Sequence, residues 1–241
     1  MNLLIQFPTY TRPQKFINAL KRYLFFSSGC HQLHFNINCD SGDATMANDE
    51  MRQEIDGVFS EHNTRRIEQQ SYSLNYDQNT SKISSMNAHI DGKDFDIVVC
   101  ASDDMIPKVK SWDDIICQEM VKHFPDLSGC VHFNDGNTGD SLITLSILGR
   151  ELYNHFGYIY HPDYKTLYCD NEFTECVKSM GKWAYVDKEI ISHEHWSVSG
   201  SENHNQIDIA VQKTLHYSGR DATVYRIRKI KGFPKGRITD D

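Results

Sequence analysis

The 241-residue sequence contains no Cys-x-x-Cys pair, and its cysteine count of seven is odd. A disulfide framework is therefore not expected, and a reducing compartment is predicted. No apolar run reaches the roughly 18 residues that a membrane-spanning helix needs. The apolar stretch before Pro8 is also too short for a signal peptide, so the sequence predicts a cytoplasmic protein without a membrane span.

Positive charge is the scarcer sign in this chain. Lys and Arg total 25 and Asp and Glu total 33, which gives a formal net charge of −8. An acidic chain is a poor general binder of nucleic acid or anionic membrane. One basic run departs from this balance and consists of Arg226, Arg228, Lys229, Lys231, Lys235 and Arg237. Three interpretations stay open: the run binds a diphosphate group, binds a polyanion such as DNA, or is a solvated tail.

Apolar runs and helical spacing alternate along the first 135 residues. Strands are expected at 3–7, 33–39, 66–68, 95–100 and 130–133, and helices at 13–26, 46–59, 81–90 and 112–123. The run at 95–100 is apolar nearly throughout, as a strand covered on both faces should be. The alternation predicts an α/β fold with βαβ units and a mainly parallel sheet flanked by helices.

The chain beyond residue 135 is less regular. A strand is expected at 142–148, and helices at 151–156, 173–180 and 206–216. We expect one domain over residues 1–200, with a first half at about 1–107 and a second half at about 108–200. Residues 201–241 are expected to form a helical, basic C-terminal extension.

Polar clusters follow three of the expected strands, at residues 8–12, 40–43 and 102–104. Ligands of parallel α/β sheets bind at the carboxyl ends of the strands, so three such clusters indicate one shared crevice. Asp103 and Asp104 carry the oxygen ligands that Mg²⁺ and Mn²⁺ prefer. The alternative is that these two residues start a turn or cap a helix.

In this order the segments resemble the motifs of family 2 and related glycosyltransferases of the GT-A fold. PTYTR at 8–12 is similar to the P-x-Y-N-R opening of that family, and NCDSGD at 38–43 is similar to its D-D-G-S-x-D segment. SKISSMNAHI at 81–90 resembles the K/R-x-x-x-x-N-x-G/A helix, and CASDDMIP at 100–107 resembles the D-x-D segment. CDNEF at 169–173 resembles the acidic motif that heads the acceptor-side helix. The resemblance covers about residues 1–196.

The resemblance implies a GT-A fold with a nucleotide-sugar site and a divalent metal ion, Mn²⁺ or Mg²⁺. It makes residues 1–107 the nucleotide-binding half and residues 108–200 the acceptor half. The donor-binding residues that it implies are Pro8, Thr9, Tyr10, Arg12, Asp40, Lys82, Asn87, Ser102, Asp103 and Asp104. In such a site Tyr10 packs against the base and Asp40 reads the uracil edge. The implied metal ligands are Asp103 and Asp104, with His193 or His195 as a later ligand.

Three positions depart from the family pattern. Ala101 stands where the first Asp of D-x-D is usual, so metal binding must rest on Asp103, with or without Asp104. Cys169 replaces the usual Glu before Asp170, and Thr11 replaces the common Asn. These changes indicate a divergent branch and leave the stereochemical outcome of transfer open.

The catalytic base is expected on the acceptor side. A carboxylate there would take the proton of the acceptor hydroxyl, and such general-base catalysis contributes roughly 10²–10⁴-fold. Asp170 is the first candidate and Glu172 the second. The alternative for both is helix capping, because acids in the first turn of a helix stabilise it through the dipole.

Acceptor contacts are expected from a polar loop and from aromatic residues. The candidates are Asn134, Asp135, Tyr164 and Trp196. Polar loops of this kind commonly carry substrate contacts. A plain turn at 134–140, half-buried surface at 158–164 and a core position for Trp196 are the structural alternatives.

Taken together, these features predict transfer of a sugar from a nucleotide sugar, expected to be a UDP-sugar, to a hydroxyl acceptor. The acceptor candidates are a hydroxylated DNA base, a glycan and a protein side chain. A nucleotidyltransferase is the second hypothesis, although no Gly-rich phosphate loop follows the first strand. A non-catalytic nucleotide-sugar or carbohydrate-binding module is the third, and Ala101 favours it. The donor sugar and the oligomeric state stay open.

Overall fold

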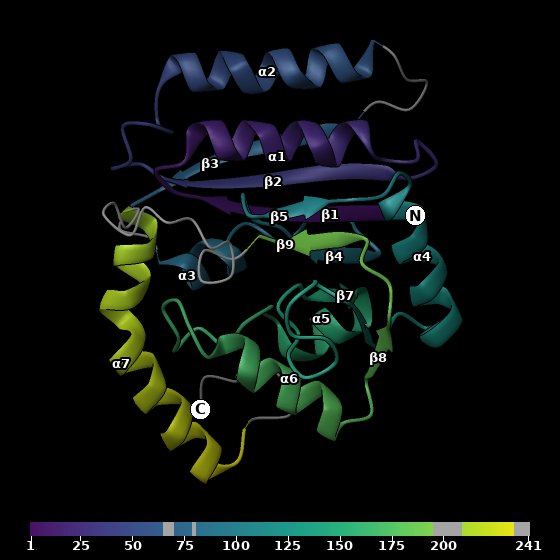
Figure 1. Ribbon diagram of the computed structural model, residues 1–241, viewed down its shortest axis with the longest axis vertical. Helices are drawn as coiled ribbons and strands as arrows, with labels where there is room; N and C mark the ends of the chain where they lie inside the picture. The colour runs from purple at the N-terminus through teal and green to yellow at the C-terminus, as the bar shows by residue number, and fades with distance from the viewer. Residues whose placement is uncertain (65–69, 79–80, 195–208, 234–241) are drawn as a thin grey trace.

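A computed structural model describes residues 1–64, 70–78, 81–194 and 209–233. Figure 1 shows a central sheet with helices on both sides. The sheet has seven strands in the order β3-β2-β1-β4-β7-β6-β8. The strand bounds are β1 Asn2–Thr9, β2 Gln32–Asp40, β3 Ser71–Asp77, β4 Ile97–Cys100, β6 Cys130–Phe133, β7 Ile147–Gly149 and β8 Trp183–Val186. All neighbouring pairs are parallel except the two that β7 makes, so the predicted mixed, mainly parallel sheet is confirmed.

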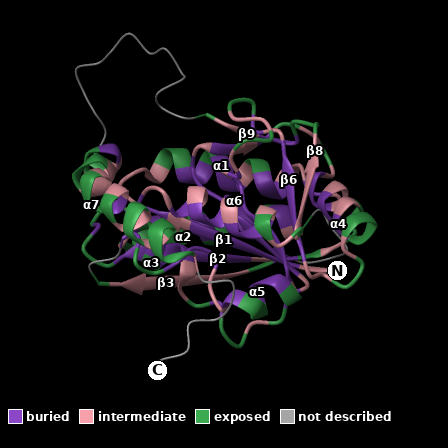
Figure 2. Cartoon of the chain, turned by 90° about the horizontal axis from the view of Figure 1, so that it is seen from below, coloured by how far each residue is buried: buried purple, intermediate pink, exposed green. Residues whose placement is uncertain are grey.

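Helices cover both faces of this sheet. The helix bounds are α1 Pro13–Phe25, α2 Asp49–Asn63, α3 Lys82–Asn87, α4 Trp112–His123, α5 Arg150–Phe156, α6 Cys169–Ser179 and α7 Ile209–Lys231. One core cluster joins the sheet to α1, α2 and α4, and a second joins it to α3, α5 and α6. Figure 2 shows β1, β2 and β6 as mostly buried, the edge strands β3 and β8 as mostly intermediate, and parts of the helices as exposed. Burial on both faces explains why β1 and β4 are apolar runs rather than alternating ones.

A separate two-stranded ribbon pairs β5 (Met105–Pro107) with β9 (Ile191–His193) in antiparallel fashion. No strand was expected for β5, β8 or β9. Each of them has three or four residues, too few for a period of two to stand out in the sequence. These strands form because residues distant in the chain pair with them.

Several element boundaries differ from expectation. The strand expected at 66–68 lies outside the described residues, and β3 begins at Ser71. The strand expected at 142–148 is reduced to β7, and α6 begins four residues before the expected helix at 173–180. Helix α7 runs to Lys231, far beyond the expected end at residue 216.

Pro8 was expected to stop the first strand, yet β1 continues through it to Thr9. The carbonyl of Gln6 faces β4, where it accepts the N–H of Ala101 at 2.9 Å. The backbone nitrogen of Pro8, two residues later, faces the same side. Strand β4 has already ended there, at Cys100, so it offers no partner for an N–H group at this position. The missing N–H of proline therefore costs the sheet no hydrogen bond.

His132 of β6 provides a prediction about stability. It is completely buried, and among the described residues neither ring nitrogen has a hydrogen-bond partner. Burial lowers the pKa of His132 from 6.5 to about 4, because the imidazolium would lose its hydration. Between these values the unfolded chain binds a proton that the folded chain does not, so the free energy of unfolding falls as the pH drops from 6.5 to 4.

Between pH 7 and pH 4 the free energy of unfolding should fall by about 2–3 kcal/mol less in His132→Leu than in the wild type, because one pKa unit corresponds to about 1.4 kcal/mol. Urea denaturation at pH 7 and pH 4 measures it. His216→Leu, at an exposed histidine of α7, is the matched control. An equal loss of stability in wild type and His132→Leu would contradict the prediction.

Candidate active site

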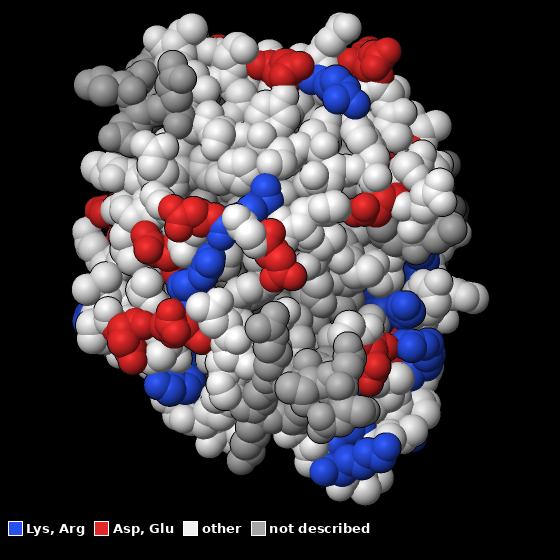
Figure 3. All heavy atoms as spheres, turned by 180° about the vertical axis from the view of Figure 1, so that it is seen from behind, with Lys and Arg blue, Asp and Glu red and all other residues white. Residues whose placement is uncertain are grey.

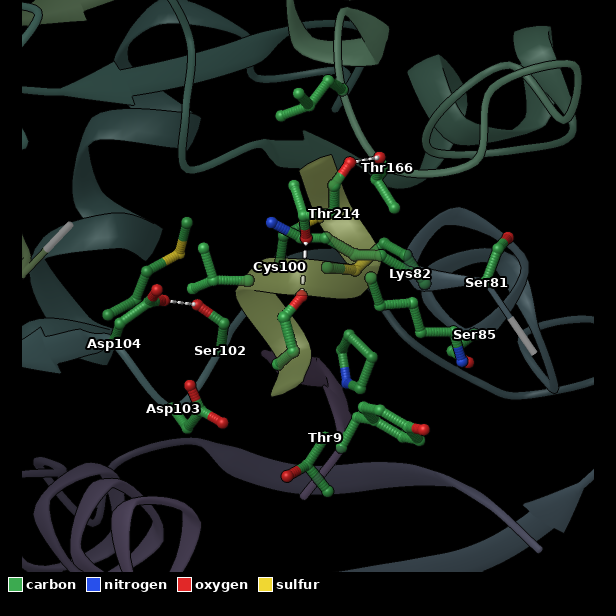
Figure 4. Close-up of a pocket in the computed structure, with 18 of the residues that line it drawn as sticks. Thr9, Ser81, Lys82, Ser85, Cys100, Ser102, Asp103, Asp104, Thr166 and Thr214 are labelled. Carbon is green, nitrogen blue, oxygen red and sulfur yellow. Dashed lines mark hydrogen bonds between the residues drawn. The ribbon is translucent and has the colours of Figure 1, made fainter. Parts of the chain in front are cut away.

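A pocket of about 380 Å³ lies at the carboxyl ends of β1 and β4 (Figure 4). It is walled by the ends of these strands, the start of α3, the start of α6, β9 and the first turns of α7. The predicted site residues that line it are Pro8, Thr9, Tyr10, Arg12, Lys82, Ser102, Asp103, Asp104, Asp170 and His193. The crevice at the strand ends therefore gathers polar groups from distant segments of the chain.

The ribbon of β5 and β9 brings His193 to Asp104. Met105 pairs with His193 in this ribbon, and the N–H of Glu194 donates to the carbonyl of Asp104 at 2.7 Å. His193 Nε2 then lies 3.9 Å from Asp104 Oδ1. Burial acts to raise the pKa of Asp104, but Lys82, the hydrogen bond from Ser102 and the nearby His193 together hold this pKa below its ordinary value. Asp104 is thus an ionised carboxylate that faces an imidazole.

Asp103 has a different partner. Its Oδ1 accepts a hydrogen bond from Arg12 Nη1 at 2.9 Å. Burial raises the pKa of Asp103 to about 6, although Arg12 opposes the rise. Thr11, just before Arg12, has a left-handed φ of 56°, which is unusual for a β-branched residue. Asp43 holds this turn by accepting the N–H of Thr11 at 2.6 Å.

Lys82 stands at the start of α3, a short helix that the sheet itself positions. Ser81 and Ser84 form a capping box at its first turn. Buried amides of the strands hold its other end: Gln6 and Asn38 donate to the carbonyl of Ser85 at 3.3 and 3.0 Å. These amides are not among the site residues expected from the sequence, although polar residues inside apolar strands are the signal that marks them.

Asn87 was expected among the donor-binding residues, but it lies outside the lining of the pocket. Its side chain donates to the carbonyl of Tyr160 at 2.6 Å and accepts the N–H groups of Ile159 and Tyr160 at 3.0 and 3.1 Å. In the structure Asn87 therefore joins α3 to the segment after α5.

The two candidate bases at the start of α6 have different surroundings. Asp170 lines the pocket, and its Oδ1 accepts the N–H of Asn171 at 2.9 Å. Glu172 is buried outside the lining, where it is paired with Arg228 at 2.7 Å and accepts the hydroxyl of Tyr164 at 2.7 Å. Only Asp170 is therefore available to a molecule in the pocket.

Helix α7 reaches the pocket from the end of the chain. Its residues Ala210, Val211, Lys213, Thr214 and Leu215 line the pocket. Lys213 Nζ lies 3.7 Å from Asp40 Oδ2 and 4.1 Å from the centre of the Tyr10 ring. Asp40 is the last residue of β2 and itself lies outside the lining. This role of α7 was not predicted from the sequence. The helix follows the last recognised motif, and its own residue pattern does not indicate which surface it packs against.

The remaining acceptor candidates lie away from the pocket lining or outside the described residues. Asn134 donates to Asp187 at 3.0 Å. Asp135 accepts the N–H groups of 137 and 138 and the hydroxyl of Thr144, which itself lines the pocket. Tyr164 is completely buried against Glu172. His195 and Trp196 lie outside the described residues.

The described helices and the surface charge bear on possible contacts with membranes and polyanions. No helix in the described part of the chain is long and apolar enough to cross a membrane. Figure 3 shows acidic and basic side chains interspersed over the face behind Figure 1. The basic residues of α7 are partly neutralised by ion pairs, since Arg228 and Lys229 contact Glu172 and Glu175.

Comparison with known proteins adds information about the fold. No family model and no curated protein sequence matches the chain. The structure is similar to that of the mannosyltransferase PcManGT from Pyrobaculum calidifontis, solved in complex with GDP-Man and Mn²⁺. That similarity has a TM-score of 0.58 and 11% sequence identity, and it covers 97% of this chain and 76% of that chain.

The structure is also similar to S. aureus TarS, with a TM-score of 0.54 and 12% identity over 90% of this chain. The 1–349 segment of TarS in complex with UDP-GlcNAc gives a TM-score of 0.52 and 13% identity over 80% of this chain. The chain spans 44% of the first TarS chain and 58% of the second, so it corresponds to a part of that protein. These similarities, together with the sheet order and the strand-end pocket, show that the chain has a GT-A-like glycosyltransferase fold.

Proposed function

We propose that this chain transfers a sugar from a nucleoside-diphosphate sugar to a hydroxyl acceptor. The observation that carries the proposal is the pocket, which combines cations from three elements with an Asp104–His193 pair and a separate carboxylate, Asp170. Arg12, Lys82 and Lys213 supply the positive charge that a diphosphate requires. Thr9 Oγ1 is buried and lacks a hydrogen-bond partner among the described residues, so it is a further group for a polar ligand.

A divalent ion, Mn²⁺ or Mg²⁺, fits best between Asp104 and His193. Their separation of 3.9 Å is too long for a hydrogen bond but lies within the span of two metal–ligand bonds of about 2.1 Å each. No set of three or more His, Cys, Asp or Glu side chains in the described ranges is arranged to hold a metal. The donor phosphates and water would therefore complete the shell. A bound ion would offset the negative charge that grows on the leaving phosphate.

Asp103 takes a different part in this proposal from the one that the sequence alone indicated. Its pairing with Arg12 makes it a group that holds Arg12 toward the donor. Asp104, with its lowered pKa, becomes the principal carboxylate ligand. Asp170, which lines the same pocket, accepts the proton of the acceptor hydroxyl.

The donor base and the acceptor need direct measurement. The similar structures carry different nucleotides, GDP-Man in one and UDP-GlcNAc in another, so the fold does not choose between bases. We propose UDP, because the segment NCDSGD at 38–43, which contains Asp40, resembles the uracil-reading motif. A hydroxylated DNA base, a glycan and a protein hydroxyl remain the acceptor candidates. Acceptor affinity that falls steeply with salt would favour the DNA base.

The test of the proposed function is a thermal shift with UDP, GDP, ADP and CDP, each with and without Mn²⁺. A ligand that binds only the folded chain stabilises it by about 2.7 kcal/mol at one hundred times Kd. We expect a metal-dependent rise in Tm with one nucleoside diphosphate. No shift with any nucleotide would contradict the proposal and favour a non-catalytic module.

A pair of variants tests the assignment of the metal ligands. Asp104→Asn is expected to weaken Mn²⁺-dependent nucleotide binding at least about tenfold, because it removes an ionised ligand. Asp103→Asn is expected to weaken nucleotide binding with and without the metal alike, because it releases Arg12. Asp126→Asn, an exposed carboxylate outside the pocket, is the control. If only Asp103→Asn removes the metal dependence, the two roles are reversed.

A further inference from the structure

Helix α7 is built into the pocket through its first two turns. Figure 1 shows it on the side to which the arrowhead of β2 points, which is the side of the polar strand ends. In Figure 4 Thr214 lies opposite Thr166, and the hydroxyl of Thr166 donates to the carbonyl of Thr214 at 3.2 Å. Val211 is buried in the same region. The wall formed by α7 thus consists of packed residues rather than a loose extension.

Lys213 is the cation of this wall. Its side chain keeps 30% of its area exposed, and its ammonium group lies beside the Asp40 carboxylate and over the ring of Tyr10. An ammonium on a flexible stem is a compact charge that suits phosphate oxygens. Lys213 comes from α7, whereas Arg12 directly precedes α1 and Lys82 begins α3. An anion in the pocket would therefore meet positive charge from three separate segments of the chain.

Asp221, two turns further along α7, explains how the helix is held there. It is completely buried, and its carboxylate accepts the N–H groups of Lys165, Thr166 and Leu167 at 3.1, 2.7 and 3.0 Å. Hydrogen bonds from N–H groups to a carboxylate are among the strong ones, and a buried charge without them would cost several kcal/mol. Asp221 therefore joins α7 to residues 165–167.

Residues 165–167 in turn contact the groups of the site. Thr166 and Leu167 line the pocket, and Asp170 follows three residues later. The carbonyl of Lys165 accepts the N–H of Ile83 at 3.1 Å, next to Lys82. One buried carboxylate on α7 thus connects the helix to the segments that carry Lys82 and Asp170.

We propose that α7 is the closing wall of the donor pocket, in which Lys213 binds the anionic diphosphate of the nucleotide and Asp221 is the positioning residue that fixes the wall. The Lys213 part rests on the proposed function. Residues 209–221 are thereby assigned to the active site. The basic end of the helix lies outside the pocket lining and is not part of this assignment.

Binding of UDP and of GDP, measured by calorimetry with Mn²⁺, tests Lys213. Lys213→Met keeps the stem and removes the charge, and it is expected to weaken binding about tenfold or more. Lys213→Arg should retain most of the affinity. Lys231→Met, on an exposed residue of the same helix, is the matched control and should bind as the wild type does. Wild-type affinity in Lys213→Met would overturn the assignment of Lys213.

Amide hydrogen exchange tests Asp221 without any nucleotide. Asp221→Asn keeps the volume but turns an amide N–H₂ toward donors that need an acceptor. We expect faster exchange at the amides of 165–167 while the strand amides of β1 remain protected, together with weaker UDP binding. Unchanged exchange at 165–167 would overturn the role of Asp221. If wild type binds no nucleotide, the proposed function and the Lys213 part fail, and exchange still decides whether Asp221 fixes the wall.

Discussion

Asp170→Asn is expected to lower turnover by about 10²–10⁴-fold while affinity for the nucleoside diphosphate stays close to that of the wild type. Asp170 lines the pocket at the start of α6, whereas Asp104 and His193 reach the same pocket from other segments. Asparagine keeps the shape but cannot accept the proton of the acceptor hydroxyl. Steady-state rates and nucleotide Kd, measured on the same preparations, check the result.

The alternative role for Asp170 is helix stabilisation, since its carboxylate accepts the N–H of Asn171 in the first turn of α6. That role predicts only a loss of about 0.3–1 kcal/mol in the free energy of unfolding and no loss of turnover. Asn171→Ala, at the neighbouring position outside the pocket lining, is the matched control. Full turnover in Asp170→Asn would remove Asp170 from the chemistry and require a base elsewhere.

Arg228→Met is expected to lower the free energy of unfolding by about 3–5 kcal/mol, because it leaves the carboxylate of Glu172 buried without its partner. Arg228 contacts Glu172 through two nitrogens, at 2.8 and 2.7 Å, and the Glu172 side chain is only 5% exposed. The pKa of Arg228 lies above its ordinary value: burial opposes the rise, but the hydrogen bond and charge of Glu172 outweigh it. Urea denaturation at pH 7 measures the loss.

Lys229→Met provides the control on the same turn of α7. The ion pair of Lys229 with Glu175 is largely exposed, with side chains 52% and 41% accessible, and such pairs contribute about 0–1 kcal/mol. Adding Glu172→Gln to Arg228→Met should recover part of the stability, because the unpaired charge is removed. Equal losses in Arg228→Met and Lys229→Met would contradict the assignment of a buried pair.

Much of the strand-end chemistry is predictable from local sequence. Polar residues that directly follow a buried apolar run must lie at a strand end, and parallel strands bring such ends to one edge. For this reason the sequence predicts Tyr10, Arg12, Asp103 and Asp104 as site residues, and all four line the pocket.

Partners within the site were less predictable. The resemblance to GT-A glycosyltransferases indicated that His193 and the aspartates belong to one site, but it did not indicate which aspartate His193 faces. The register of the β5–β9 ribbon decides this, because it sets His193 opposite Met105 and hence beside Asp104. Glu172 shows the same limit: two acids two residues apart on a helix point in different directions, and only Asp170 faces the pocket.

The sequence by itself determined the α/β class, the mainly parallel sheet and the crevice at its strand ends, because these follow from the periodicity and order of apolar runs. Only the tertiary structure decided that α7 closes the pocket, that Arg228 neutralises Glu172 and that Asp221 holds residues 165–167. The contacts of Asp221 with Thr166 and of Arg228 with Glu172 join residues 55 and 56 positions apart. Such pairing is set by the packing of whole elements, which leaves no periodic signal in the chain.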